Sequence, residues 1–239
     1  MKFALAFLLT LIPLSAWQLP ANSSQAVVGV APAWNSSQVT LSFYQRGSSG
    51  WQKVGGTING RLGKNGLAWG LGLHPVPANA KLKKEGDSRA PAGVFSIGGA
   101  WGYAPDIKRH PRLPYRQVTS RDLWVEDTKS PSYNHHLILP REPSTAWEHK
   151  QQMKQGDYAH SLKVFIAHNA PPHPRPGLGS AIFFHIWRGG GSKPTAGCTT
   201  ISEASLKSLI AWLNPDQNPV YVLLPANEYQ RLRAPWKLP

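Results

Sequence analysis

The sequence predicts a mainly β fold of the α+β class, with one or two short helices. Its apolar residues occur in short runs, several of which alternate with polar residues, and Gly and Pro are abundant, at 22 each. This combination is typical of short strands joined by many turns rather than of a helical bundle. With 41% hydrophobic residues among 239, the chain can bury one substantial core, so we expect a single domain over residues 38–239.

The segment before this domain is predicted to have two parts. Residues 1–16 combine a basic start, an apolar run that ends at Leu14 and a small residue at a plausible cleavage point, which is the pattern of a secretory signal peptide. The apolar run is short and contains Pro13, so it does not predict a stable membrane anchor. Residues 17–37 are polar and rich in Ser and Asn, and we expect a flexible leader there.

Five segments of the domain are predicted to be strands, from either alternation or a run of β-branched and aromatic residues. They are residues 38–44, 91–97, 162–168, 181–187 and 220–224. The turn sequence GSSG after the first of them predicts a hairpin partner that begins at Trp51. Clustered glycines predict very short strands and tight turns over residues 55–72, and Gly98-Gly99 is expected to end the second strand.

Two segments are predicted to be helical. Residues 146–155 have a helix-like composition, and Ser202 is a candidate N-cap for a helix that ends near Leu213 and has apolar residues at helical spacing. Residues 105–145 are rich in Pro, His, Tyr and charged residues and show little periodicity. An irregular stretch of this length in a compact domain is usually a binding loop or a cover over a site, so we expect it to be functional.

The chain contains one cysteine, Cys198, and His185 lies 13 positions before it. A single cysteine cannot pair within the chain, so it is an inert buried thiol, a partner for another molecule or a reactive group. A thiol needs a base to become nucleophilic at neutral pH, and a strand, a turn and a returning segment can bring His185 beside Cys198. Acyl transfer also needs donors for the oxyanion, which the N–H groups around Gly197 can supply, with the Thr195 hydroxyl beside them. One Cys and one His leave a zinc site half empty, so we predict no metal and no cofactor.

The chain is strongly basic, with a formal net charge of +14 at pH 7. A basic exported protein is attracted to anionic polymers, such as cell-wall glycans or phosphates. The Lys and Arg residues are scattered, however, and the sequence contains no motif of a nucleic-acid-binding fold. We therefore expect anionic wall polymers as possible partners and no nucleic-acid partner.

The strip HIWRGGGSKPTAGCTT resembles the active site of the L,D-transpeptidases of bacterial cell walls, which have the YkuD fold. In that family a His at a strand end precedes a Gly-containing loop and a Ser/Thr-His-Gly-Cys strip, and Thr195, Gly197 and Cys198 match three of these four positions. The segment DSRAPAGVFSIGGAWGY resembles the family's P-x-G-x-F/Y strand, through Pro91, Gly93 and Phe95. The segments WVEDTKSPSYNH and NAPPHPRPGLGSAIFFHIW resemble a divergent branch with Thr-Ala-Gly-Cys at the nucleophile. Ala196 stands where most members have a second His, and Thr200 stands where many have Asn or Arg.

The resemblance implies a YkuD-like β-sandwich and a cysteine L,D-transpeptidase that acts on peptidoglycan stem peptides. It implies that Cys198 is the nucleophile, that His185 is the general base and that the backbone at Gly197 binds the oxyanion. It also implies a bacterial protein of the periplasm or cell wall, which agrees with the predicted signal peptide.

Candidates for substrate contacts, besides Thr195, lie on both sides of this strip. Arg188 can bind a stem carboxylate with two hydrogen bonds, or it is a solvated arginine. The WVED and YN strips, which recur in the divergent branch, contribute Asp127, Tyr133 and Asn134. These three residues form either a polar wall around the site or ordinary turns.

Two alternatives stay open at this point. If water replaces the stem amine, the enzyme is an L,D-carboxypeptidase, an endopeptidase or an amidase of the same fold. A non-catalytic wall-binding module would use the basic surface alone and would leave Cys198 without a chemical role.

Overall fold

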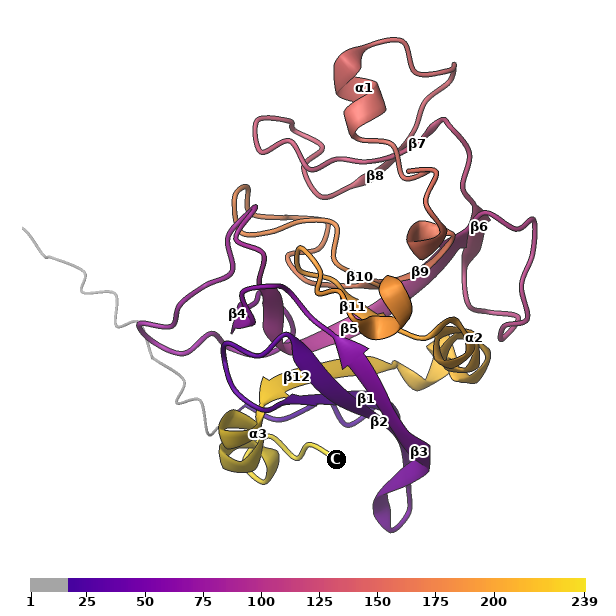
Figure 1. Ribbon diagram of the computed structural model, residues 1–239. Helices are drawn as coiled ribbons and strands as arrows, with labels where there is room; N and C mark the ends of the chain where they lie inside the picture. The colour runs from indigo at the N-terminus through magenta and orange to yellow at the C-terminus, as the bar shows by residue number, and fades with distance from the viewer. Residues whose placement is uncertain (1–16) are drawn as a thin grey trace, which may run out of the picture.

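The computed structural model describes residues 17–239, drawn as a ribbon in Figure 1. The predicted signal peptide, residues 1–16, lies outside the described residues. Within the described part of the chain the strands are β1 (Gln25–Ala31), β2 (Gln38–Gly47), β3 (Gly50–Arg61), β4 (Leu67–Trp69), β5 (Ala90–Gly102), β6 (Tyr115–Gln117), β7 (Asp122–Trp124), β8 (His136–Ile138), β9 (Leu162–Ile166), β10 (Phe183–Ile186), β11 (Thr199–Ile201) and β12 (Val220–Pro225). The helices are α1 (Ala146–Lys150), α2 (Glu203–Trp212) and α3 (Ala226–Arg233), with 3-10 turns η1 (Tyr158–His160), η2 (Gly189–Gly191) and η3 (Pro215–Gln217). The prediction of a mainly β fold with short helices is confirmed.

The strands form a two-layered sandwich whose sheet closes on itself. Neighbouring strands pair in the order β12, β1, β2, β3, β11, β10, β9 and β5, and β5 pairs in turn with β12. The first part of β5, from Gly93 to Ser96, pairs with β12, whereas the part from Ile97 to Gly102 pairs with β9. A register shift between Ile97 and Ala100 separates the two parts, and such a bulge bends a strand. β5 therefore belongs to both layers.

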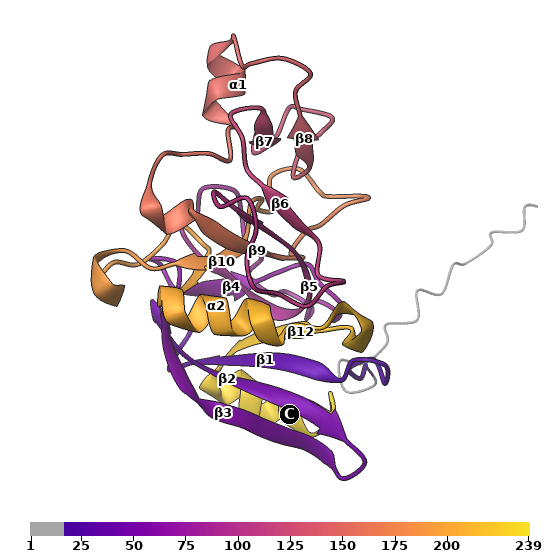
Figure 2. The same ribbon diagram turned by 90° about the vertical axis from the view of Figure 1, so that its right-hand side faces the viewer.

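The core lies between the two layers. Phe184 of β10 packs on Tyr221 of β12, with ring centroids 4.6 Å apart, which joins one layer to the other. Helix α2 lies between the layers at one end of the sandwich and buries its apolar face there (Figure 2). The start of α2 agrees with the sequence prediction, because the Ser202 side chain accepts a hydrogen bond from the N–H of Ser205.

All five predicted strands form, as β2, β5, β9, β10 and β12, although β9 and β10 are shorter than the segments 162–168 and 181–187 predicted for them. The prediction that Gly98-Gly99 ends the second of them is wrong, because the bulge takes up both glycines and β5 continues to Gly102. The prediction of very short strands is wrong for the segment up to Arg61, which belongs to the long strand β3 and pairs with β2. The sequence patterns also do not predict α3.

Residues 17–37 are not a flexible leader. Residues 25–31 form β1, which is buried along almost its whole length between β12 and β2. Before β1, the buried residue Leu19 donates its N–H to the carbonyl of Trp236. The prediction failed because Ser and Asn residues flank an apolar run, AVVGVA. Such a run is the pattern of a strand that is covered on both faces.

Residues 118–157 form a lobe over the outer face of β9 and β10 (Figure 1). Residues 105–117 lead into the lobe beside β5 and α2, and they include β6. The lobe contains the two-stranded sheet of β7 and β8, and α1, which ends at Lys150, short of its predicted end. Trp124 of β7 packs against the sandwich, with its ring centroid 4.7 Å from that of Phe165 and 4.8 Å from that of Phe183. The predicted irregular stretch thus covers one face of the sheet.

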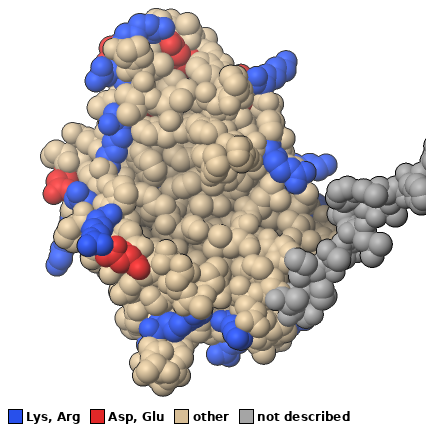
Figure 3. All heavy atoms as spheres, turned by 180° about the vertical axis from the view of Figure 1, so that it is seen from behind, with Lys and Arg blue, Asp and Glu red and all other residues tan. Residues whose placement is uncertain are grey.

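The basic side chains are spread over the surface. On the face shown in Figure 3 they lie around the rim and leave the centre free of Lys and Arg, so this face has no single basic patch for an anionic polymer. None of the helices in the described chain has the length and apolar character that crossing a bilayer requires.

Candidate active site

The outer face of the sheet brings three polar residues into one row. His185 of β10 pairs with Lys163 of β9 and with Thr200 of β11, so the three residues lie side by side across the strands. Cys198 directly precedes β11 and lies two positions before Thr200. Because side chains alternate along an extended chain, Cys198 faces the same side of the sheet as His185.

The thiol of Cys198 is held by the backbone that leads into β10. Its Sγ accepts a hydrogen bond from the N–H of Phe183 at 3.4 Å and donates one to the carbonyl of Ala181, also at 3.4 Å. Cys198 is only partly exposed, and burial raises the pKa of its thiol to about 11. The resting form is therefore the neutral thiol.

The imidazole of His185 is oriented by its own strand. Its Nδ1 lies 2.9 Å from the carbonyl oxygen of Ile186. A carbonyl only accepts, so Nδ1 carries the proton and Nε2 has the lone pair that can take the thiol proton. Burial, together with the neighbouring His160, lowers the pKa of His185 to about 3. Thiol and imidazole are both neutral at rest, and the thiolate forms only as its proton moves.

Thr195 holds the turn that ends at Cys198. Its hydroxyl donates to the Cys198 carbonyl at 2.7 Å and accepts from the Gly197 N–H at 3.0 Å. Gly197 has a φ of +154°, and a Cβ at this position would lie 3.0 Å from the carbonyl oxygen of Arg89, so the turn requires glycine. Contrary to expectation, the Gly197 N–H is thus engaged within the turn. The N–H groups of Ala196 and Cys198 donate to no other group in the described chain and remain as candidate oxyanion donors.

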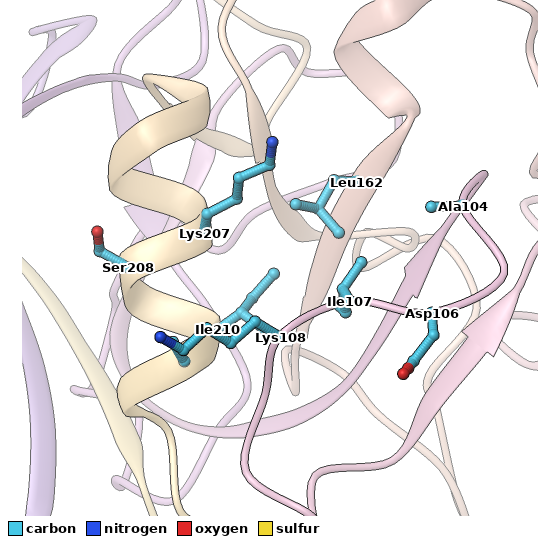
Figure 4. Close-up of a pocket in the computed structure, with 9 residues that line it drawn as sticks. Ala104, Asp106, Ile107, Lys108, Leu162, Lys207, Ser208 and Ile210 are labelled. Atoms are coloured by element: carbon cyan, nitrogen blue, oxygen red, sulfur yellow. The ribbon is translucent and has the colours of Figure 1, made fainter.

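Cys198 and His185 open into one cavity of about 370 Å³. The cavity brings together five of the eight predicted site residues, namely Thr195, Gly197, Cys198, His185 and Arg188. A separate hollow of about 540 Å³ lies between α2 and residues 104–108, but neither a cysteine nor a histidine lines it (Figure 4). We therefore assign the chemistry to the cavity that contains the thiol.

Besides this larger cavity of about 370 Å³, a smaller cavity of about 50 Å³ reaches Cys198 from the side of the lobe. The residues that line both cavities are Glu126, Gln155, His160, Ala181 and Cys198, so the two hollows meet at the thiol. Trp124 and Lys163 line only the smaller one. Its volume admits a few water molecules or the end of a slender side chain, but not a peptide.

Arg188 is already engaged by an acidic partner. Its guanidinium forms an ion pair with Asp157 and also lies 3.3 Å from Nδ1 of His160. Burial opposes ionisation of Asp157, but the hydrogen bonds from Arg188 and His160 outweigh it and lower the pKa of Asp157 to about 2. A substrate carboxylate must therefore compete with Asp157 for Arg188. No group of three or more His, Cys, Asp or Glu side chains in the described chain is placed to hold a metal ion.

All three residues predicted from the lobe, Asp127, Tyr133 and Asn134, lie outside the lining of both cavities. Asp127 accepts hydrogen bonds from the N–H of Lys129 and the indole N–H of Trp147. It therefore has the structural role in a turn that was the alternative to a substrate contact. Tyr133 is buried and donates its hydroxyl to Glu85, which does line the cavity. Tyr133 therefore acts on the site only through Glu85.

Asn134, the third lobe residue, is fully buried, and its side chain makes four hydrogen bonds. Its Oδ1 accepts from the indole N–H of Trp124 at 2.8 Å and from the N–H of Ala181 at 3.0 Å. Its Nδ2 donates to the carbonyls of His168 at 3.2 Å and Asn169 at 2.7 Å. The Ala181 carbonyl accepts a hydrogen bond from the Cys198 thiol. Asn134 therefore positions the backbone segment to which the nucleophile is hydrogen-bonded.

Sequence reasoning missed several polar residues of the site, among them the buried Lys163, which lines the smaller cavity. Lys163 is 3% exposed, its Nζ donates to the carbonyl of Met153 at 3.0 Å, and it forms no ion pair with a described residue. Burial lowers the pKa of its ammonium group to about 8. A lysine in the otherwise apolar strand LKVFI is the signal that would have identified it. Further polar residues that sequence reasoning missed line the larger cavity, and they include Lys83, Glu85, Glu126, Gln155, His160 and Ser180.

A family model of the L,D-transpeptidase catalytic domain, YkuD, matches residues 34–222 of this chain. The match covers more than half of the chain and includes every residue of the two cavities. A search of the curated proteins and a search of the solved structures gave no match.

Proposed function

The chain belongs to the L,D-transpeptidase family defined by the YkuD catalytic domain, and we propose that it is itself a cysteine L,D-transpeptidase of peptidoglycan. The family in general acts on the stem peptides of peptidoglycan. The observation that carries the proposal is that the Cys198 thiol and the His185 imidazole line one cavity, with Nδ1 of His185 tied to a backbone carbonyl. The volume of that cavity, about 370 Å³, suits a short peptide.

In the first half-reaction, Cys198 Sγ attacks the carbonyl carbon of the third stem residue, commonly diaminopimelate, in the amide bond that joins it to D-Ala. As the C–S bond forms, the thiol proton passes to Nε2 of His185, which then delivers it to the nitrogen of the departing D-Ala. The N–H groups of Ala196 and Cys198 stabilise the oxyanion. Because both reacting groups start neutral, attack and proton transfer are coupled.

In the second half-reaction, another nucleophile resolves the thioester. A side-chain amine of a neighbouring stem gives a 3→3 cross-link, whereas water gives a trimmed stem and an L,D-carboxypeptidase activity. We propose the amine as the principal acceptor and treat water as the alternative that product analysis distinguishes.

The substrate also bears on location. Peptidoglycan lies outside the cytoplasm, so this activity requires export, and the apolar run of residues 4–14 supports a signal peptide. We therefore propose a mature protein that works in the periplasm or cell wall.

Intact-mass spectrometry after incubation with a tetrapeptide stem tests the proposal. We expect the wild-type protein to gain the mass of the stem less D-Ala, with D-Ala released, and Cys198→Ala to gain none. His185→Gln should slow adduct formation by about 100-fold or more, whereas His149→Gln, a change at an exposed histidine of α1, should leave it unchanged. Cross-linked dimers would identify an amine acceptor, and trimmed monomers would identify water. The absence of adduct and turnover, with equal wall binding by wild type and Cys198→Ala, would instead support a wall-binding module.

A further inference from the structure

A second imidazole, that of His160, stands beside the reacting pair. The ring centroids of His160 and His185 are 4.5 Å apart, and the ring planes are inclined by 27°. His160 comes from the 3-10 turn η1, whose N-cap residue is Asp157. His185 lines only the larger cavity, whereas His160 lines both cavities that meet at Cys198.

Asp157 fixes the tautomer of this second imidazole. Its Oδ1 lies 2.7 Å from Nδ1 of His160 and also accepts the His160 N–H at 3.2 Å, while Arg188 pairs with its other oxygen. The carboxylate lies closer to Nδ1, at 2.7 Å, than the Arg188 guanidinium does, at 3.3 Å, so the proton stays on Nδ1 and Nε2 has a free lone pair. Nε2 makes no hydrogen bond to any described residue.

The surroundings of His160 favour its unprotonated form. Burial and the ammonium group of Lys163 lower the pKa of His160, and Asp157 only partly opposes them. The titratable and charged groups around it are Asp157 on its own turn, Lys163 on β9, His185 on β10, Arg188 after β10, and Glu126 from the lobe. An imidazole with a free Nε2 in such surroundings is placed to accept a proton.

The two cavities are suited to the two half-reactions. The larger one has room for the stem, so after the first half-reaction the acyl group occupies the cavity that His185 lines. The smaller one, of about 50 Å³, still reaches Cys198 and has no room for a peptide. A second substrate that enters from this side must therefore be water or a slender primary amine.

We propose that His160, oriented by Asp157, is the general base for the nucleophile that resolves the thioester, and that this nucleophile approaches through the smaller cavity. The inference rests on the proposed function. The amine or water adds to the thioester carbonyl while Nε2 of His160 takes its proton. The C–S bond then breaks, and the Cys198 thiolate recovers a proton from His160, which restores the resting site.

The test separates the two half-reactions in time. Adduct formation and adduct decay are followed by intact mass after the protein is mixed with a tetrapeptide stem, first with water as the only acceptor and then with a stem that carries a free side-chain amine. For His160→Gln we expect adduct formation within about threefold of wild type and adduct decay slower by about 100-fold, so that the acyl-enzyme accumulates. Asp157→Asn should show a smaller effect of the same kind, and His149→Gln, the control, should show none.

The pH dependence of adduct decay distinguishes a base from a structural support. In wild type, decay should slow at acidic pH as His160 becomes protonated, and this acid limb should disappear in His160→Gln. Added imidazole should restore decay in His160→Ala. Equal slowing of formation and decay, or no effect on either, would overturn the inference while leaving the proposed function intact. A wild-type protein that forms no adduct would overturn both. If His160→Gln does not fold, the formation and decay rates of Asp157→Asn decide the question.

Discussion

Replacing Asn134 with Leu is expected to destabilise the protein by about 5 kcal/mol. The side chains are similar in size, but Leu leaves four partners of Asn134 without a hydrogen bond, namely two N–H groups and two carbonyls. At about 1 kcal/mol for each buried group, the loss is about 4 kcal/mol. Asn134 also has a φ of +57°, where Leu costs about 1 kcal/mol more than Asn.

Thermal unfolding measures this loss directly. For a domain of this size, about 5 kcal/mol corresponds to a fall in Tm of about 10–20 °C. The matched control is Asn79→Leu, since Asn79 has a φ of +59° but is exposed, so it reports the backbone cost alone. If Asn134→Leu lowers the Tm by no more than Asn79→Leu does, the four hydrogen bonds contribute nothing and the reasoning is wrong.

Three further predictions concern the site and its support. Lys163→Met removes a positive charge near Cys198 and should slow alkylation of the thiol by iodoacetamide at pH 8 by about tenfold. Lys163→Arg should retain most of the wild-type rate, and equal rates in wild type and both variants would contradict this prediction. Gly197→Ala should reduce the rate of adduct formation by about tenfold or more, because a side chain is strained at a φ of +154° and its Cβ would lie only 3.0 Å from the Arg89 carbonyl oxygen. An unchanged rate would show that the turn tolerates a side chain. Burial opposes ionisation of Asp122, but hydrogen bonds led by that of Arg116 outweigh it and lower the pKa of Asp122 to about 2. This carboxylate stabilises the fold above its unfolded pKa of about 3.9 and loses that contribution as pH falls toward 2, so urea unfolding should show a loss of about 2 kcal/mol between pH 5 and pH 2 that is absent in Asp122→Asn.

The features that the sequence predicts correctly depend on local patterns. Alternation and apolar runs identify β2, β5, β9, β10 and β12, and the Ser202 cap identifies the start of α2. The strip that joins His185 to Cys198 is also local, because β10 and β11 are neighbours in the sheet as well as in sequence. The structure brings these two residues to one cavity, as the spacing predicts.

The features that the sequence misses depend on contacts between distant segments. The segment of β1 was predicted to be a leader because its apolar run has polar neighbours, and its position between β12 and β2 explains why it is buried. His160 and Lys163 reach the thiol because β9 lies beside β10 and the lobe folds over both. The sequence also does not indicate that the Gly197 N–H donates to the Thr195 hydroxyl, because spacing contains no such detail of turn geometry.

The closed ring of strands has a consequence for how the chain is made. β12, near the C-terminus, is the partner of both β1 and the first part of β5, so neither strand is fully paired until almost the whole chain has been synthesised. Contacts between such distant segments form slowly. The ring of strands therefore cannot close before β12 has been synthesised. Truncation before Val220 would open the ring on two sides at once, so even a short C-terminal deletion should prevent folding of the entire domain.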